Sequence, residues 1–164
     1  MRSLLHIVAV IMILSALALG STACGDDSCY DNGSSLPLAT FYRGGTPQTI
    51  NGLTIKGIGV PGDSLLADSI SLSEAYLPLR ATTTSTSYAL SRWIATDAGQ
   101  LCIRDTLTID YQPIEYFHSV ECGAMFNFEV NQVRHTTHGI DSVILVNDLI
   151  TNAAVPSIRI YFAQ

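Results

Sequence analysis

The sequence predicts an all-β domain, an antiparallel β-sandwich of the immunoglobulin-like kind, that follows an N-terminal signal peptide. Several short segments alternate apolar and polar residues, which is the period of a half-buried strand. Turn-forming residues separate these segments at short intervals. No segment after the leader keeps the period of an amphipathic helix. A β-barrel is the alternative architecture for the same pattern.

Residues 1–23 have the features of a signal peptide that is removed from the mature protein. Arg2 supplies the positive start, and from Ile7 to Leu19 only Ser15 is polar. A helix of roughly 13 residues spans about 20 Å, which is short of the ~30 Å hydrocarbon core of a bilayer. The leader therefore predicts export.

The residues Gly20-Ser21-Thr22-Ala23-Cys24 are similar to the lipobox of bacterial lipoproteins, in which the cysteine becomes the acylated first residue. The usual pattern has leucine three places before the cysteine, where this chain has Ser21. Lipidation of Cys24, with acyl chains such as palmitate, predicts an outer-membrane lipoprotein of the cell envelope, facing the periplasm or the surface. Cleavage after Gly20 or Ala23 would instead release a soluble exported protein.

We expect residues 24–37 to form a flexible acidic tether and residues 38–164 to form the β-sandwich domain. Removing Arg2 with the leader leaves 7 basic against 14 acidic residues, a balance of −7. Lys56 is the only lysine, and no basic patch is visible, so nucleic acid is a poor partner. Asp26 and Asp27 also look like the acidic signals that follow the lipidated cysteine in Bacteroidota surface lipoproteins.

In the first half of the domain, Leu53 and Ile55 predict a strand that Gly57 and Gly59 interrupt with a bulge or a close backbone approach. Residues 82–87 read as a loop. A core strand with Trp93 follows, and the chain turns at 97–99. The expected strands of this half cover residues 38–42, 53–56, 69–73, 75–79 and 88–94.

In the second half, residues 106–111 show the clearest alternation, and Pro113 is expected to end that strand. Phe126 to Val130 alternates as well, and Val133 breaks the phase, which predicts a bulge at residues 131–132. Residues 142–146 are apolar on both faces and predict a central strand. Residues 158–162 form the last expected strand.

Four cysteines are present, and an exported protein can keep disulfides. If Cys24 carries lipid, then Cys29, Cys102 and Cys122 remain, and the residues alone leave their connectivity open. A bond between Cys29 and Cys122 would staple the N-terminal segment to the domain. Cys102 is expected to be buried as a small apolar residue.

The strongest candidate for chemistry is the cluster of His135, His138 and Asp141, which could ligate a metal only if a turn gathered the three side chains. The alternative is a hairpin connection in which Asp141 binds turn amides. No Gly-x-Ser-x-Gly elbow is present, and Ser64 and His118 read as turn and strand residues. Aromatic residues that could line a sugar-binding face, or lie in the core, are Tyr30, Tyr42, Tyr76, Tyr88 and Trp93.

Three blocks of the second half carry a family resemblance: Glu121–Phe126 (ECGAMF), Val133–Val143 (VRHTTHGIDSV) and Ile158–Phe162 (IRIYF). In this order they resemble a Bacteroidota family of small lipoproteins of unknown function, numbered 6452. Asn147-Asp148 stands where the family usually has Asn-Pro. The resemblance implies a β-rich envelope lipoprotein without a known activity. The family also has a cysteine near the start of the mature chain, which corresponds to Cys29, and this favours pairing Cys29 with Cys122.

We therefore expect an envelope-anchored, non-enzymatic lipoprotein that acts as a structural or interaction module. It needs no cofactor or metal, contacts the membrane through its lipid, and has a protein or glycan partner that the sequence does not name. The alternatives are a surface glycan- or peptide-binding module that uses exposed aromatics or a sheet edge, and a metal-dependent enzyme.

Overall fold

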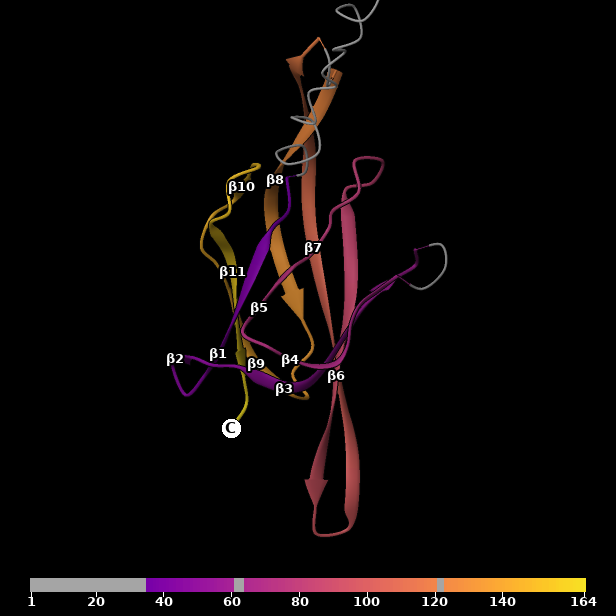
Figure 1. Ribbon diagram of the computed structural model, residues 1–164, viewed down its shortest axis with the longest axis vertical. Helices are drawn as coiled ribbons and strands as arrows, with labels where there is room; N and C mark the ends of the chain where they lie inside the picture. The colour runs from indigo at the N-terminus through magenta and orange to yellow at the C-terminus, as the bar shows by residue number, and fades with distance from the viewer. Residues whose placement is uncertain (1–34, 61–63, 121–122) are drawn as a thin grey trace, which may run out of the picture. The chain divides into compact units, whose positions relative to one another are not determined.

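The computed structural model describes residues 35–60, 64–120 and 123–164, and every regular element among them is a β-strand (Figure 1). The chain divides into two units, Met1–Asp31 and Asn32–Gln164, and all described residues belong to the second unit. The strands are β1 (Leu38–Arg43), β2 (Thr46–Pro47), β3 (Ile50–Ile58), β4 (Leu65–Leu72), β5 (Glu74–Tyr76), β6 (Ser85–Thr96), β7 (Gly99–Ser119), β8 (Gly123–His135), β9 (Ile140–Leu145), β10 (Leu149–Ile150) and β11 (Pro156–Phe162). The all-β prediction is confirmed.

The first sheet, sheet A, has the strand order β2-β1-β11-β9, and β5 pairs with β1 beside β2. Its central pair, β1 and β11, runs parallel, whereas the other strand pairs of the described chain are antiparallel. The prediction of a purely antiparallel sandwich is therefore wrong at this pair. The predicted central strand at residues 142–146 is wrong as well, because β9 pairs only with β11 and lies at the sheet edge.

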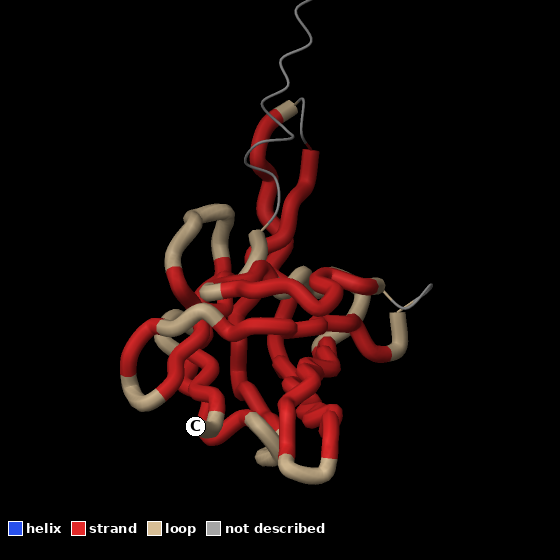
Figure 2. Tube along the Cα trace, turned by 60° about the horizontal axis from the view of Figure 1, so that its bottom comes forward, coloured by secondary structure: helices blue, strands red, loops and turns tan. Residues whose placement is uncertain are grey.

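The second sheet, sheet B, has the order β10-β8-β7-β6-β3-β4, and all of its neighbouring strands run antiparallel. Figure 2 shows the described chain as strands joined by loops. The predicted turn at residues 97–99 connects β6 to β7, and Thr96 pairs with Gly99 at the end of this hairpin. Gly99 has a φ of 123°, which a side chain would strain. The predicted loop at 82–87 is too long, because β6 begins at Ser85.

The inner faces of the two sheets share one hydrophobic core, so the alternation in the sequence translates directly into burial. Leu107, Ile109 and Tyr111 are all fully buried, as the clearest strand pattern predicts. Members from both sheets include Phe41, Leu53, Ile55, Tyr88, Leu90, Phe128, Val130, Ile158, Ile160 and Phe162. Trp93 is an exception to the predictions: its side chain is 62% exposed and lies outside the core.

Strand β7 continues through Pro113 to Ser119, so the prediction that Pro113 ends it is wrong. The reason lies in the pairing: β6 begins opposite Asp110, and beyond that point β7 pairs only with β8. Proline lacks an amide N–H and is tolerated where one side of a strand has no neighbour. The predicted bulge is confirmed, because Asp110 pairs with Gln132 and Tyr111 with Val130, which leaves Asn131 unpaired.

Candidate functional site

A hollow of about 440 Å³, here called the outer groove, lies on sheet B and is lined by residues of β3, β4, β6 and β7 and by Gly59. Small side chains of β6, Ala89 and Ser91, lie beside Lys56 and Thr54 in the sheet register. On the other side Ser91 pairs with Arg104. A strand with small residues between long neighbours leaves a depression, so this register explains the groove. Its lining is Thr54, Lys56, Gly57, Ile58, Gly59, Asp68, Ala89, Ser91, Trp93, Cys102 and Arg104.

Trp93 contributes to the outer groove because the phase of β6 turns it away from the core. Tyr88 and Leu90 are buried, and successive residues of a strand face opposite sides. Trp93 pairs with Cys102, which also lines the groove and is a free, half-buried thiol. The prediction that Cys102 is buried is therefore only partly right.

The groove carries two cations without a partner in the described part of the chain. Within those residues the ion pairs are Arg134 with Asp110 and His138 with Asp105, so neither Lys56 nor Arg104 is neutralised. Asp68 lines the same hollow but forms no ion pair there. The outer groove thus combines an exposed indole, two cations and one carboxylate. Sequence reasoning missed Lys56 and Arg104, although both occupy the polar phase of their strands.

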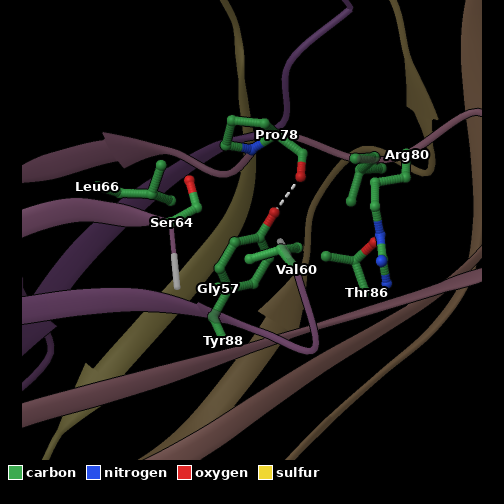
Figure 3. Close-up of a pocket in the computed structure, with 9 residues that line it drawn as sticks. Gly57, Val60, Ser64, Leu66, Pro78, Arg80, Thr86 and Tyr88 are labelled. Atoms are coloured by element: carbon green, nitrogen blue, oxygen red, sulfur yellow. Dashed lines mark hydrogen bonds between the residues drawn. The ribbon is translucent and has the colours of Figure 1, made fainter. Parts of the chain in front are cut away.

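A smaller cavity of about 250 Å³ lies beside Tyr88 and is lined by this residue and by residues that precede it in the chain, among them Gly57 and Pro78 (Figure 3). The Tyr88 hydroxyl donates a hydrogen bond to the Pro78 carbonyl (Figure 3). Burial raises the pKa of Tyr88 well above its usual value, the nearby Tyr111 adds to this, and Arg80 opposes it. Tyr88 therefore stays neutral and fastens the segment before β6. The hypothesis that it lies on a sugar-binding face is wrong.

Arg80, on the wall of the same cavity, holds this segment from the other side. Its guanidinium donates to the carbonyls of Gly59 at 3.3 Å and Ser85 at 3.5 Å. The residues that line this cavity are Gly57, Val60, Ser64, Leu66, Pro78, Leu79, Arg80, Thr86 and Tyr88. At Gly57 an added Cβ would lie 3.0 Å from a methyl carbon of the Val60 side chain, not from backbone. Strand β3 runs through Gly57 and ends at Ile58, so the prediction that Gly57 interrupts it is wrong.

The other candidate aromatics are scattered. Tyr42 and Tyr161 lie on sheet A with ring centroids 4.9 Å apart, and the Arg159 guanidinium lies 5.7 Å from the Tyr42 centroid. Tyr76 is exposed on β5. Tyr30 lies outside the described residues. The structure therefore does not gather the predicted aromatics on one face.

The histidine cluster forms a turn that is organised by Asp105, for which the sequence predicted no contact with this turn. This buried carboxylate accepts hydrogen bonds from the backbone N–H groups of His138 at 2.7 Å, Gly139 at 2.6 Å and Ile140 at 2.9 Å. The Thr136 hydroxyl donates to it at 2.7 Å, and His138 Nδ1 lies 3.2 Å away.

Burial opposes the charged form of Asp105, but the hydrogen bonds from Thr136, His138, Gly139 and Ile140 together lower its pKa below the usual 3.8. The Asp105 carboxylate is therefore charged and stabilises the turn. His135 Nδ1 lies 2.9 Å from the Thr136 carbonyl, and Asp141 is exposed. Over residues 35–60, 64–120 and 123–164, no group of three His, Cys, Asp or Glu side chains could hold a metal ion.

Several sequence predictions concern residues that the structure does not describe. The predicted leader, the predicted lipid attachment at Cys24, most of the predicted tether at 24–37, and the cysteines Cys29 and Cys122 lie outside the described ranges. Ser64 is exposed at the cavity rim, and the described residues that line this cavity include no histidine or carboxylate that could activate it. The side chain of His118 is not among those that the structure describes. Among the described residues no helix is long and apolar enough to cross a bilayer.

Comparison with known proteins adds one result. No curated protein and no solved structure matches the chain. A protein-family profile matches residues 52–162, a range that includes most of sheet B, the Asp105 turn and the last strand of sheet A. Since the match covers more than half of the chain, the protein belongs to the Family of unknown function (DUF6452).

Proposed function

We propose that this protein is an envelope-anchored lipoprotein without catalytic activity, and that its immunoglobulin-like β-domain is an interaction module which binds an acidic glycan in the outer groove. The observation that carries the proposal is the exposed Trp93 beside the unpaired cations Lys56 and Arg104. A volume of about 440 Å³ falls within the range of roughly 300–1,000 Å³ for small-ligand sites.

The chemistry of the groove favours a sugar over an apolar ligand. The flat face of an indole packs against the C–H face of a pyranose ring, while its N–H remains available as a donor. Lys56 and Arg104 can donate to a carboxylate or sulfate on the same sugar, and charge-assisted hydrogen bonds of this kind are the stronger ones. Asp68 can accept from sugar hydroxyl groups.

A peptide added at a sheet edge is the weaker alternative. Strand β4 is an edge of sheet B with Leu65 and Ile70 exposed, which could attract an extended partner. However, its register with β3 shifts at three places, and Ser69 has a φ of 54°. Such irregularities twist an edge away from regular pairing. The geometry therefore favours the groove.

Glycan binding is testable through Trp93, which is the only tryptophan of the chain. We expect titration of the full chain with oligogalacturonate to shift the tryptophan emission to shorter wavelength as the indole is covered. Removing a central aromatic anchor costs about 2 kcal/mol or more, so Trp93→Ala should weaken binding about 30-fold by calorimetry. Lys56→Gln and Arg104→Gln should weaken it less.

Arg134→Gln is the matched control, because Arg134 is an exposed arginine on β8 that does not line the groove. Neutral dextran should bind more weakly than oligogalacturonate. If neither glycan changes the emission, or if Trp93→Ala binds as tightly as the parent chain, glycan binding in the outer groove is refuted.

Anchoring is tested separately. We expect Cys24→Ala to move the protein from the membrane fraction to the soluble fraction, because stable attachment would depend on the acyl chains at that residue. Mass spectrometry of the mature N-terminus should find a diacylglyceryl-cysteine at position 24. Cys102→Ala is the control and should stay with the membrane. An unmodified, soluble parent protein would contradict the anchor and leave the glycan proposal standing.

A further inference from the structure

Two arginines face each other between the sheets, on the side of sheet B opposite to Trp93. On β1, Arg43 continues the inward phase of the buried Ala39 and Phe41. On β6, Arg92 continues the inward phase of Tyr88 and Leu90. Both arginines are half-buried.

Phe162, the last residue of β11, is a neighbour of both arginines. Arg43 pairs with Phe162 in the parallel register of β1 and β11. The Arg92 guanidinium carbon lies 5.9 Å from the centroid of the same ring. The two arginines therefore share Phe162 as a neighbour, and the charge of Arg43 is close enough to act on Arg92.

Neither guanidinium is satisfied by the described part of the protein. The Nε atoms of Arg43 and Arg92 are buried without a hydrogen-bond partner, and neither residue forms an ion pair there. Burial lowers the pKa of Arg92, and the neighbouring Arg43 lowers it further, whereas Asp105 opposes both. Asp105 offsets this charge only from a distance: it forms no ion pair with either arginine, and its oxygens accept from the turn amides and from Thr136.

Two like charges with buried, unpaired donors are costly unless an anion neutralises them. Guanidinium groups bind oxyanions through forked, parallel hydrogen bonds, and phosphate offers enough oxygens and charge for two of them. We propose that a phosphate group binds between Arg43 and Arg92. This site is independent of the outer groove, because Arg92 and Trp93 are consecutive residues on opposite faces of β6.

The test is thermal unfolding of the full chain in inorganic phosphate against chloride at equal ionic strength. A ligand that binds only the folded state raises the Tm, and we expect a rise of about 3 °C at phosphate well above its dissociation constant. Arg92→Met and Arg43→Gln should each abolish the rise. Arg104→Gln, a cation of the outer groove, should retain it.

A second readout does not depend on phosphate. Removing one of two facing like charges relieves repulsion, so Arg92→Met in chloride should have a Tm at or above that of the parent. A clear fall in that Tm would show that the arginine is satisfied within the protein and would overturn the site. Equal Tm values of the parent chain in phosphate and chloride would overturn it too, as would a rise that both variants keep.

A third Tm measurement, in glycerol 3-phosphate, distinguishes a phosphate ester from free phosphate as the natural ligand. A rise equal to or above that with inorganic phosphate assigns the site to a phosphate ester, such as a lipid headgroup. A smaller rise assigns it to the free ion.

Discussion

Replacing Asp105 by alanine is expected to lower the free energy of unfolding by about 3–5 kcal/mol, because three backbone N–H groups and the Thr136 hydroxyl lose their acceptor together. Two of these N–H groups, those of Gly139 and Ile140, are buried where water cannot replace the carboxylate. For a domain of this size the Tm should fall by about 10 °C. Chemical denaturation and calorimetry measure both quantities.

The control for this change is Asp110→Ala. Asp110 also has a lowered pKa, through hydrogen bonds from Ser85 and Arg134, but its ion pair with Arg134 is exposed. An exposed pair contributes about 1 kcal/mol or less. Equal losses for Asp105→Ala and Asp110→Ala would show that the turn does not depend on the buried carboxylate.

The contribution of Asp105 should also depend on pH. Its pKa in the folded protein is below the usual 3.8, so the unfolded state takes up a proton first as the pH falls. The stabilisation is therefore complete above about pH 5 and is lost as the pH drops through the folded-state pKa. The stability difference between the parent chain and Asp105→Asn should narrow over that range. A difference that stays constant down to the acid transition would contradict this role.

Removing a single oxygen in Tyr111→Phe is expected to lower the free energy of unfolding by about 2 kcal/mol. The buried hydroxyl donates to the Arg80 carbonyl at 2.9 Å and accepts from the Arg80 N–H at 3.0 Å. It also lies 2.7 Å from the Thr86 hydroxyl and 3.2 Å from that of Thr83. Phenylalanine would leave the Arg80 N–H and Thr86 without this partner. Equilibrium unfolding in urea measures the loss.

Tyr161→Phe is the matched control, since Tyr161 stacks on Tyr42 through its ring on the outer side of sheet A. We expect it to change stability by less than about 0.5 kcal/mol. If Tyr111→Phe is equally mild, the segment from Leu77 to Ser85 is held by its apolar contacts and not by the hydroxyl network.

Local alternation in the sequence is enough to predict the burial of strand residues and the position of the bulge. Leu107, Ile109 and Tyr111 are buried because every second residue of β7 faces the core, and the phase break at Val133 marks a bulge because one residue has no opposite partner. These features depend on neighbours in sequence, so one segment at a time is enough to predict them.

The errors concern pairing between distant segments. Nothing in residues 38–43 or 156–162 shows that the two strands run parallel, because each could pair in either direction. Because β6 begins at Ser85, opposite Asp110, β7 has no β6 neighbour at Pro113, and the proline is acceptable there. Ser85 and Pro113 are far apart in the chain, so local sequence does not reveal this. Likewise, Asp105 and the 136–140 turn come together only when β7 and β8 pair.

The candidate site was predictable in part. The alternation that buries Tyr88 and Leu90 predicts that Trp93 faces outward. The apolar residues around Trp93 instead suggest a core position, and the alternation decides the outcome. The groove itself needs Lys56 from β3 and Arg104 from β7 on either side of β6, which only the sheet order supplies.

The parallel pairing of β1 and β11 has a mechanical consequence. A load applied at the start of β1 and at the end of β11 acts along both strands in opposite directions. The hydrogen bonds from Ala39 to Arg43 would then share the force and must break together, whereas a hairpin pulled from its open end unzips one bond at a time. If the proposed N-terminal lipid anchor holds the domain, β1 is the first strand to take up a pulling force, and this pairing would resist it.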